Sequence, residues 1–287
     1  MQEYPYSISF PMEYPSNPYA TIYENVYSYR EENRMSLSIT FIGTDGIVMA
    51  TDSRLVVQQG EFSRHRDNEQ KLWKIEDNYG LTCVDNHSGY ANFLREEFIS
   101  IVSAMKKKSG AKTINIREMV KMMSLFLKGQ FAPYAEMMSD TILKGSGYTM
   151  EFVLAGYMGK NPKVFKLSSQ ATKYPFSETI IVDWCPSGIS SIANYWMEKL
   201  RNCIYEYSDN KVIPREDVET LKKIAVIIID ETSQVFSDYV GGAIQVAIIK
   251  PDMAELFKVD ESVIANSGIR QITSGNMLLD QIKRLKI

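Results

Sequence analysis

The feature that most limits how this chain folds is a strand–turn–strand pattern that begins abruptly at Ser36. Apolar and polar side chains alternate over residues 36–41, which is the period of a half-buried β-strand. Asp45 and Gly46 give a turn signal, and residues 47–50 return as a second apolar strand. Because tight hairpins pair antiparallel, we expect the folded domain to begin with an antiparallel sheet at this point.

The segment before this hairpin has a different character. Residues 1–35 are rich in tyrosine and proline and keep no regular spacing of apolar residues. Proline breaks helices and removes a hydrogen-bond donor from strands, so we expect a poorly ordered extension, a propeptide or an arm that docks elsewhere. The predicted organisation is therefore an N-terminal extension over residues 1–35 and one domain over residues 36–287.

The periodicities after the hairpin predict an α+β domain. The expected order is strands, two helices, strands, two helices and a strand, with a polar loop after residue 54. The expected strands are 71–75, 79–84, 148–157, 163–167 and 243–249, and the expected helices are 89–105, 115–128, 190–207 and one that begins at Pro214. Hairpins combined with paired helices predict a four-layer αββα sandwich, in which two antiparallel sheets are flanked by helix pairs.

The composition excludes several classes of protein. Hydrophobic residues make up 45% and charged residues 23%, as in an ordinary globular domain. Lys+Arg is 32 against Asp+Glu 35, so a net charge of -3 gives no general electrostatic reason to bind nucleic acid or an anionic membrane. No apolar run approaches the roughly 18 residues of a membrane span, and the start of the chain lacks signal-peptide order. We expect a cytoplasmic protein.

The cysteines and histidines do not indicate a metal site. Cys83, Cys185 and Cys203 are widely spaced and form no C-x-x-C pair, which argues against a disulfide framework and against structural zinc. His65 and His87 are the only histidines. A Cys–His catalytic pair remains an alternative, although Cys83 lies in an apolar run typical of packing. We expect no metal and no organic cofactor.

Three polar residues stand at the ends of predicted strands: Ser36, Asp52 and Lys71. In an antiparallel hairpin the start of one strand lies beside the end of the next, so Ser36 and Asp52 can be neighbours at one rim of the sheet. Lys71 joins them if the third strand starts at the same rim. A serine hydroxyl needs a base to accept its proton. If Ser36 were the first residue, its own α-amine, with a pKa of about 7.7–8.0, would be that base.

The other two residues would support this chemistry. The Lys71 cation would lower the pKa of the amine and of the hydroxyl, and Asp52 would hold the lysine and offset the cost of burying it. Each position also has an ordinary interpretation: Ser36 as a strand serine, Asp52 as an exposed loop acid and Lys71 as a solvated strand flank.

Four segments resemble proteasome β-type subunits. Residues 43–54 resemble the first hairpin of that family, and residues 68–75 look like its next strand, which begins with the catalytic lysine. Residues 88–92 are similar to the start of its first long helix, and residues 239–243 to its late glycine-rich turn. The resemblance covers most of residues 36–250. It implies the αββα fold of N-terminal-nucleophile (Ntn) hydrolases and an enzyme that cleaves peptide bonds inside a chamber of stacked rings.

The resemblance also implies roles and partners. Asp52 and Lys71 match the family's aspartate and lysine, and Ser36 falls on the nucleophile, which is threonine in proteasomes. The substrate would be a peptide or an unfolded protein, the assembly a homo-oligomeric ring, and an ATPase a possible partner.

Other site positions are less regular. The glycine whose N–H forms the oxyanion hole aligns with Asn86, and Val84 matches a position that lines the specificity pocket. Among the accessory residues, Ser190 matches the first serine, the late aspartate falls on Ser237 with Asp238 beside it, and the last serine falls on Val240. At these positions the chain departs from the family's pattern of hydrogen bonds around the amine.

Two routes would expose Ser36. The chain could cut itself after Met35, or translation could begin at Met35, after which methionine aminopeptidase would leave Ser36 first. We favour the second route, since residues 1–34 look unlike the domain.

Three alternatives remain open. The chain could be a non-catalytic subunit of a proteasome-like ring, which the departures at Ser237 and Val240 favour. It could instead be an Ntn hydrolase of small amides, since fold does not fix function. A binding module without chemistry would leave the coincidence of Ser36, Asp52 and Lys71 unexplained.

Overall fold

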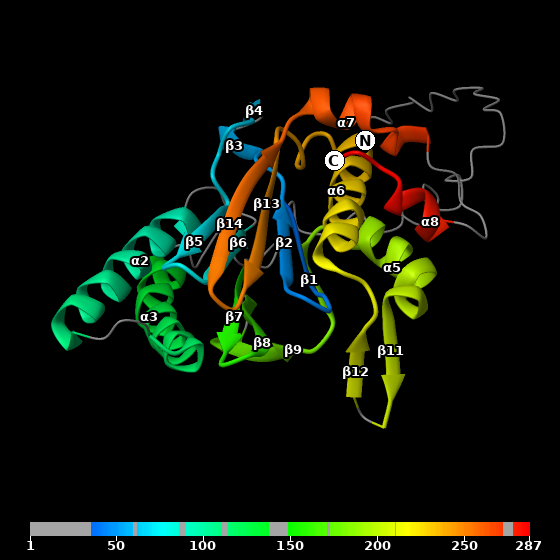
Figure 1. Ribbon diagram of the computed structural model, residues 1–287. Helices are drawn as coiled ribbons and strands as arrows, with labels where there is room; N and C mark the ends of the chain where they lie inside the picture. The colour runs from blue at the N-terminus through cyan, green and yellow to red at the C-terminus, as the bar shows by residue number, and fades with distance from the viewer. Residues whose placement is uncertain are drawn as a thin grey trace, which may run out of the picture. The chain divides into compact units, whose positions relative to one another are not determined.

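A computed structural model describes most of the chain after residue 35 (Figure 1). The described residues are 36–59, 62–85, 90–110, 114–137, 149–170, 173–209, 211–271 and 278–287. The chain divides into two units, Met1–Glu32 and Asn33–Ile287, and every described residue belongs to the second unit. Our expectation for residues 1–35 lies outside the described residues.

The predicted hairpin opens the first of two antiparallel sheets. Strand β1 (Leu37–Ile42) pairs with β2 (Ile47–Thr51), in a register that sets Ser38 opposite Thr51. The sheet has five strands in the order β10-β1-β2-β13-β14, in which β10 is Trp184–Gly188, β13 is Ile244–Lys250 and β14 is Met253–Val259. The hairpin is therefore confirmed, and it lies inside the sheet with neighbours on both sides.

The second sheet also has five antiparallel strands, in sequence order from β5 to β9. These strands are β5 (Leu72–Ile75), β6 (Tyr79–Asp85), β7 (Thr149–Met158), β8 (Asn161–Gln170) and β9 (Lys173–Ile181). One buried apolar cluster joins the two sheets, with Met49 and Ile249 from the first sheet packed with Val153 and Ala155 from the second. Burial of these facing side chains holds the sheets together.

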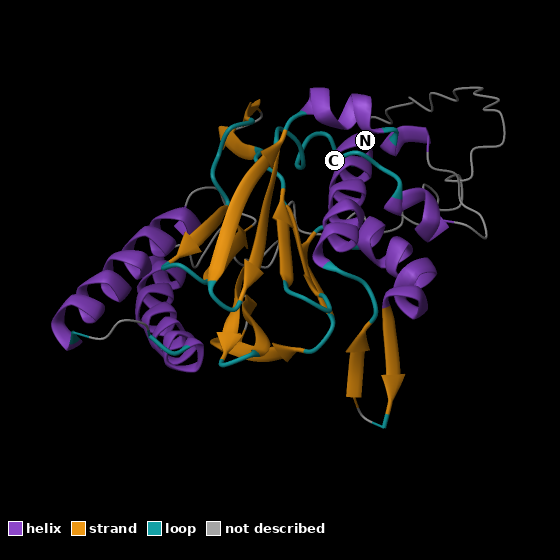
Figure 2. Cartoon of the chain, viewed as in Figure 1, coloured by secondary structure: helices purple, strands orange, loops and turns teal. Residues whose placement is uncertain are grey.

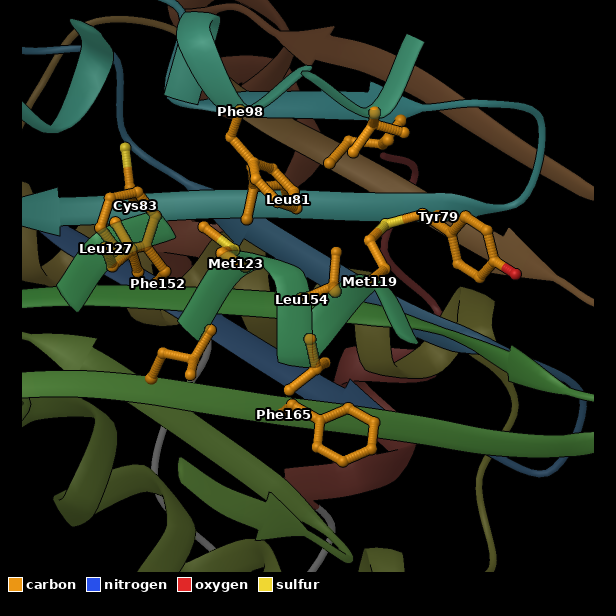
Figure 3. Close-up of a cluster of buried hydrophobic side chains, with 14 of the residues drawn as sticks. Tyr79, Leu81, Cys83, Phe98, Met119, Met123, Leu127, Phe152, Leu154 and Phe165 are labelled. Atoms are coloured by element: carbon orange, nitrogen blue, oxygen red, sulfur yellow. The ribbon is translucent and has the colours of Figure 1, made fainter. Parts of the chain in front are cut away.

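Helices cover the sheets on opposite sides (Figure 2). Helices α2 (Tyr90–Ser109) and α3 (Ile116–Met137) pack on the second sheet. Figure 3 shows Met119, Met123 and Leu127 directed at Leu81, Phe152 and Leu154. Helix α6 (Val218–Val235) packs on β1 and β2, and α5 (Ser191–Ile204) packs on α6. The mixed α+β class with antiparallel sheets is confirmed.

The last part of the chain adds short elements around α6. They are α7 (Glu261–Ser267), the 3-10 turn η1 (Ile269–Gln271) and α8 (Leu278–Lys283). None of the helices in the described segments is both long enough and apolar enough to cross a membrane.

Several expected elements were wrong in type or extent. The segment expected as a polar loop forms a hairpin of β3 (Leu55–Gln59) and β4 (Phe62–Arg66), whose first strand is rich in β-branched valine. Strands β9, β10 and β14 were not expected, so β13 is not the last strand.

The helix expected over residues 190–207 ends at Ile204, and a hairpin of β11 (Tyr205–Ser208) and β12 (Lys211–Pro214) follows. Tyr205 is buried and its hydroxyl donates to the Asp183 carbonyl at 2.8 Å, a tertiary contact that helical spacing does not reveal. Pro214 closes this hairpin, and α6 begins only at Val218.

Candidate active site

Ser36, Asp52 and Lys71 meet at one end of the two sheets. Lys71 Nζ donates to Ser36 Oγ at 2.5 Å and to Asp52 Oδ2 at 2.9 Å. The main-chain carbonyl of Arg54 is a third acceptor for the same nitrogen. A lysine ammonium has three N–H donors, and each of them here has an acceptor. Lys71 therefore contacts both Ser36 and Asp52, as the sequence predicted.

The three residues come from two different sheets. Ser36 directly precedes β1 and Asp52 directly follows β2, so the hairpin register places them side by side. Lys71 directly precedes β5, which belongs to the second sheet. We expected Lys71 to join the pair if its strand began at the same rim of the sheet, whereas the lysine reaches the hairpin from the facing sheet.

Asp52 is fully buried and its carboxylate is saturated with donors. Oδ2 accepts from Lys71 Nζ at 2.9 Å, from the Arg54 amide at 2.9 Å and from the Gly241 amide at 3.3 Å. Oδ1 accepts from the Leu37 amide at 3.2 Å. A carboxylate has about four lone-pair positions, so this charge is satisfied without water.

Gln245 on β13 is a site residue that sequence reasoning missed. Its side-chain oxygen accepts from the amides of Lys71 and Leu72 at 3.0 and 3.1 Å, and its amide nitrogen donates to the Glu69 carbonyl at 2.5 Å. Gln245 is 4% exposed, and it anchors the start of β5 to the first sheet. Its place in an otherwise apolar strand was the one available signal.

The glycine-rich turn predicted near residue 240 adjoins the trio through its backbone. The Gly241 amide binds Asp52, and the Gly241 carbonyl accepts from the Ser53 amide at 3.0 Å. Gly242 has φ +72°, and a Cβ there would lie 2.4 Å from Ser53 Oγ and 2.5 Å from the Asp67 carbonyl. Only glycine fits this close approach.

Arg54 and Asp67 form a two-pronged ion pair beside the trio. Arg54 Nε and Nη2 each donate to one Asp67 oxygen at 2.6 Å. Arg54 Nη1 donates to the Ser237 carbonyl. The hydrogen bonds between the two side chains lower the pKa of Asp67 and raise the pKa of Arg54, because each ion stabilises the charged form of the other.

The remaining predicted residues are placed less directly. Asn86 lies outside the described residues. Val84 is buried on β6, opposite Glu151 in the strand register. Ser190 is the N-cap of α5 and makes no side-chain capping bond; its neighbour Ile189 donates its amide to the Ser36 carbonyl at 3.2 Å.

The accessory positions near residue 237 contribute in different ways. The Ser237 main-chain carbonyl accepts a hydrogen bond from Arg54 Nη1, and the Asp238 charge helps to raise the pKa of Arg54. Val240 is fully buried. Within the described segments, no three His, Cys, Asp or Glu side chains gather as a metal site would require.

No protein-family model matches this chain, and a search of curated proteins finds no match.

Proposed function

We propose that this chain is a proteasome-like Ntn hydrolase that cleaves peptide bonds with Ser36 as nucleophile. The observation that carries the proposal is the 2.5 Å hydrogen bond from Lys71 Nζ to Ser36 Oγ, with Asp52 behind the lysine at 2.9 Å. The two facing sheets with helices on both sides are compatible with the αββα architecture that we propose for the domain.

We propose that Lys71 acts as a cation and not as the base, because it pairs with the buried Asp52 carboxylate at 2.9 Å. As an ammonium it would donate to Ser36 Oγ, Asp52 Oδ2 and the Arg54 carbonyl and would offer no lone pair. It instead stabilises negative charge that develops on Oγ. The base is then the α-amine of Ser36, once the chain before it has been removed.

The reaction follows from these roles. The α-amine accepts the Oγ proton while Oγ attacks the substrate carbonyl carbon, and the resulting ammonium protonates the amine leaving group as the C–N bond breaks. The remaining ester is hydrolysed when the same amine takes a proton from the water that attacks the acyl carbon. The amine then passes this proton to Ser36 Oγ as the acyl C–O bond breaks. The Asn86 amide remains our proposed oxyanion donor.

Exposure of the Ser36 amine is a requirement of the proposal. We propose that Ser36 becomes the first residue either by self-cleavage after Met35 or by removal of an initiating Met35. A peptide or unfolded-protein substrate, a ring of identical chains, an ATPase partner and a cytoplasmic location are parts of the same proposal.

A non-catalytic ring subunit is the second candidate. The observation that favours it is the apolar, fully buried Val240 at the position of an accessory serine, together with Ser237, which acts through its carbonyl. Neither position supplies an acidic side chain to the proposed amine.

The test uses a chain whose first residue is Ser36, beside the full chain. We expect the former to hydrolyse fluorogenic peptides and to take one equivalent of a peptide epoxyketone, a reagent that needs both a hydroxyl and a free amine. Ser36→Ala should lose roughly 10³-fold or more in kcat with its oligomeric state unchanged, whereas Ser36→Thr should stay active.

Intact-mass measurement identifies the working species. Active enzyme that retains residues 1–35, or an active Ser36→Ala variant, would contradict the mechanism. Normal assembly without labelling in the protein that begins at Ser36 would favour the non-catalytic candidate. Activity only on small acyl amides would change the substrate class.

A further inference from the structure

We infer that Arg54 and Asp67 are a positioning pair: their ion pair fixes the main chain of residue 54, which holds both Lys71 and Asp52 in place. The inference rests on the proposed function, because it gives the pair a role in the reactivity of Ser36. Neither side chain would contact the substrate's reacting atoms.

The main chain of Arg54 touches both partners of the catalytic ion pair. Its amide donates to Asp52 Oδ2 at 2.9 Å, and its carbonyl accepts from Lys71 Nζ. A displacement of this one residue would therefore alter the orientation of the carboxylate and of the ammonium together. Because Lys71 Nζ also contacts Ser36 Oγ, the displacement would reach the nucleophile.

The Arg54 side chain ties this backbone to two other segments. Its planar fork engages both oxygens of Asp67 at 2.6 Å, and Nη1 donates to the Ser237 carbonyl. Leu55 pairs with Arg66 at the end of the β3–β4 hairpin, so the ion pair closes the base of that hairpin. The turn that supplies Ser237 also supplies the Gly241 amide to Asp52.

The Asp67 carboxylate is not needed to hold its own backbone. The Asp67 carbonyl already accepts from Ser53 Oγ at 2.7 Å, and the Glu69 amide donates to the Ser53 carbonyl at 3.0 Å. The Asp67 side chain is 46% exposed and that of Arg54 is 17% exposed, so water screens the carboxylate end of the pair and reduces what the pair contributes to stability. Its specific contribution is to orient the Arg54 fork, which a bidentate carboxylate does well.

The charges around the pair keep it ionised during catalysis. Asp67, Asp52 and Asp238 face the Arg54 guanidinium, and Arg54, His65 and Lys71 face the Asp67 carboxylate. The hydrogen bonds from Arg54 lower the pKa of Asp67, so the carboxylate carries its charge wherever the Ser36 amine would act as a base.

The test compares Asp67→Asn with Glu206→Gln in protein that begins at Ser36. Glu206 has a side chain about as exposed as that of Asp67, and it pairs with the more exposed Arg215 across the β11–β12 hairpin, with 3.0 Å between Oε2 and Nη2. We expect Asp67→Asn to lower kcat roughly ten- to a hundredfold with KM nearly unchanged, because it moves groups that act in the transition state. Glu206→Gln should leave both constants unchanged.

The pH profile separates positioning from stability. If Lys71 is held less closely, its positive charge lowers the pKa of the Ser36 amine by a smaller amount. The acid limb of the kcat–pH profile should therefore move to higher pH in Asp67→Asn. Asp67→Glu should restore the wild-type limb. An Asp67→Asn profile that superimposes on that of Glu206→Gln would overturn the inference.

Two further measurements keep the test decisive. If Asp67→Asn does not fold, Arg54→Lys retains the charge but loses the fork, and the same kinetic shifts are expected. If the wild-type protein is inactive, the proposed function fails, and crystal structures of wild type and Asp67→Asn still decide the positioning role. An unchanged contact from Lys71 Nζ to Ser36 Oγ would refute it.

Discussion

At the scale of single residues, the site consists of two buried charges that are stable only together. Lys71 is 5% exposed and Asp52 is 0% exposed. Removing an ion from water costs several kcal/mol, and hydrogen bonds from the Leu37, Arg54 and Gly241 amides help to offset this cost for the carboxylate. The buried pair thus holds a positive charge against Ser36 Oγ where water would otherwise screen it.

Asp52→Asn should lower the free energy of unfolding by about 3–5 kcal/mol, because it leaves the Lys71 ammonium buried without its counter-charge. The double variant Asp52→Asn/Lys71→Met should lose less, since it removes both charges. Urea denaturation followed by circular dichroism measures each value. Equal losses in the single and double variants would show that the pairing of the charges is not what stabilises the site.

At the scale of elements, the start of α6 and the β1–β2 hairpin hold each other. Asp45 Oδ1 in the hairpin turn accepts from the Val218 amide at 2.9 Å, and the Thr44 amide donates to the Glu216 carbonyl at 3.0 Å. Asp217 caps α6 by accepting from the Thr220 amide at 2.8 Å. The hairpin that carries Ser36 and Asp52 is therefore fixed at its far end as well.

The Asp217 cap predicts an acid-dependent stability. The Thr220 backbone hydrogen bond is the main cause of the lowered pKa of Asp217, so its contribution is complete above the unfolded-state pKa and is lost as pH falls through the folded-state value. Asp217→Ala should cost about 1 kcal/mol at pH 7. Asp217→Asn should cost less, and its difference from wild type should shrink as the pH falls below about 4.

The matched control for this prediction is Asp260→Ala. Asp260 is the N-cap of α7 with a similar extended backbone, but its side chain makes no capping hydrogen bond. Thermal unfolding across pH should show little change in this variant. A gap between Asp217→Asn and wild type that does not vary with pH would contradict the assignment.

At the scale of the whole domain, the layers are joined by a few close approaches as well as by the apolar cores. Tyr79 on β6 is 3% exposed and its hydroxyl donates to the Ile114 carbonyl ahead of α3 at 2.7 Å. Its ring lies over Gly156 on β7, where a Cβ would be 2.1 Å from the ring. The absence of a side chain at Gly156 leaves room for the Tyr79 ring, whose hydroxyl ties the second sheet to the segment ahead of α3.

Gly156→Ala should therefore lower the free energy of unfolding by about 1–3 kcal/mol through overpacking, since neither the Tyr79 ring nor the Asn78 carbonyl, 3.2 Å from that Cβ, can withdraw freely. Gly129→Ala on α3 is the control, because nothing lies within 4 Å of a Cβ there. It should be neutral or stabilising by up to about 1 kcal/mol. Equal denaturant midpoints for Gly156→Ala and Gly129→Ala would contradict the packing argument.

The sequence by itself determined the features that depend on neighbouring residues. Alternation over residues 36–41 and the Asp-Gly turn predicted the β1–β2 hairpin, and the hairpin register alone brings Ser36 beside Asp52. Helical spacing likewise predicted α2 and α3, which pack on the second sheet. Side-chain periodicity and turn chemistry are local properties, so they can be read before the fold is known.

Only the tertiary structure decided how the trio is completed. Lys71 reaches the hairpin from the facing sheet, and Gln245, 174 positions away, fixes its backbone. The fork from Arg54 to Asp67 and the close approach at Gly242 depend on the β3–β4 hairpin, which was expected to be a loop. Contacts between distant segments leave no periodic trace in the sequence, because they arise only when the sheets pack.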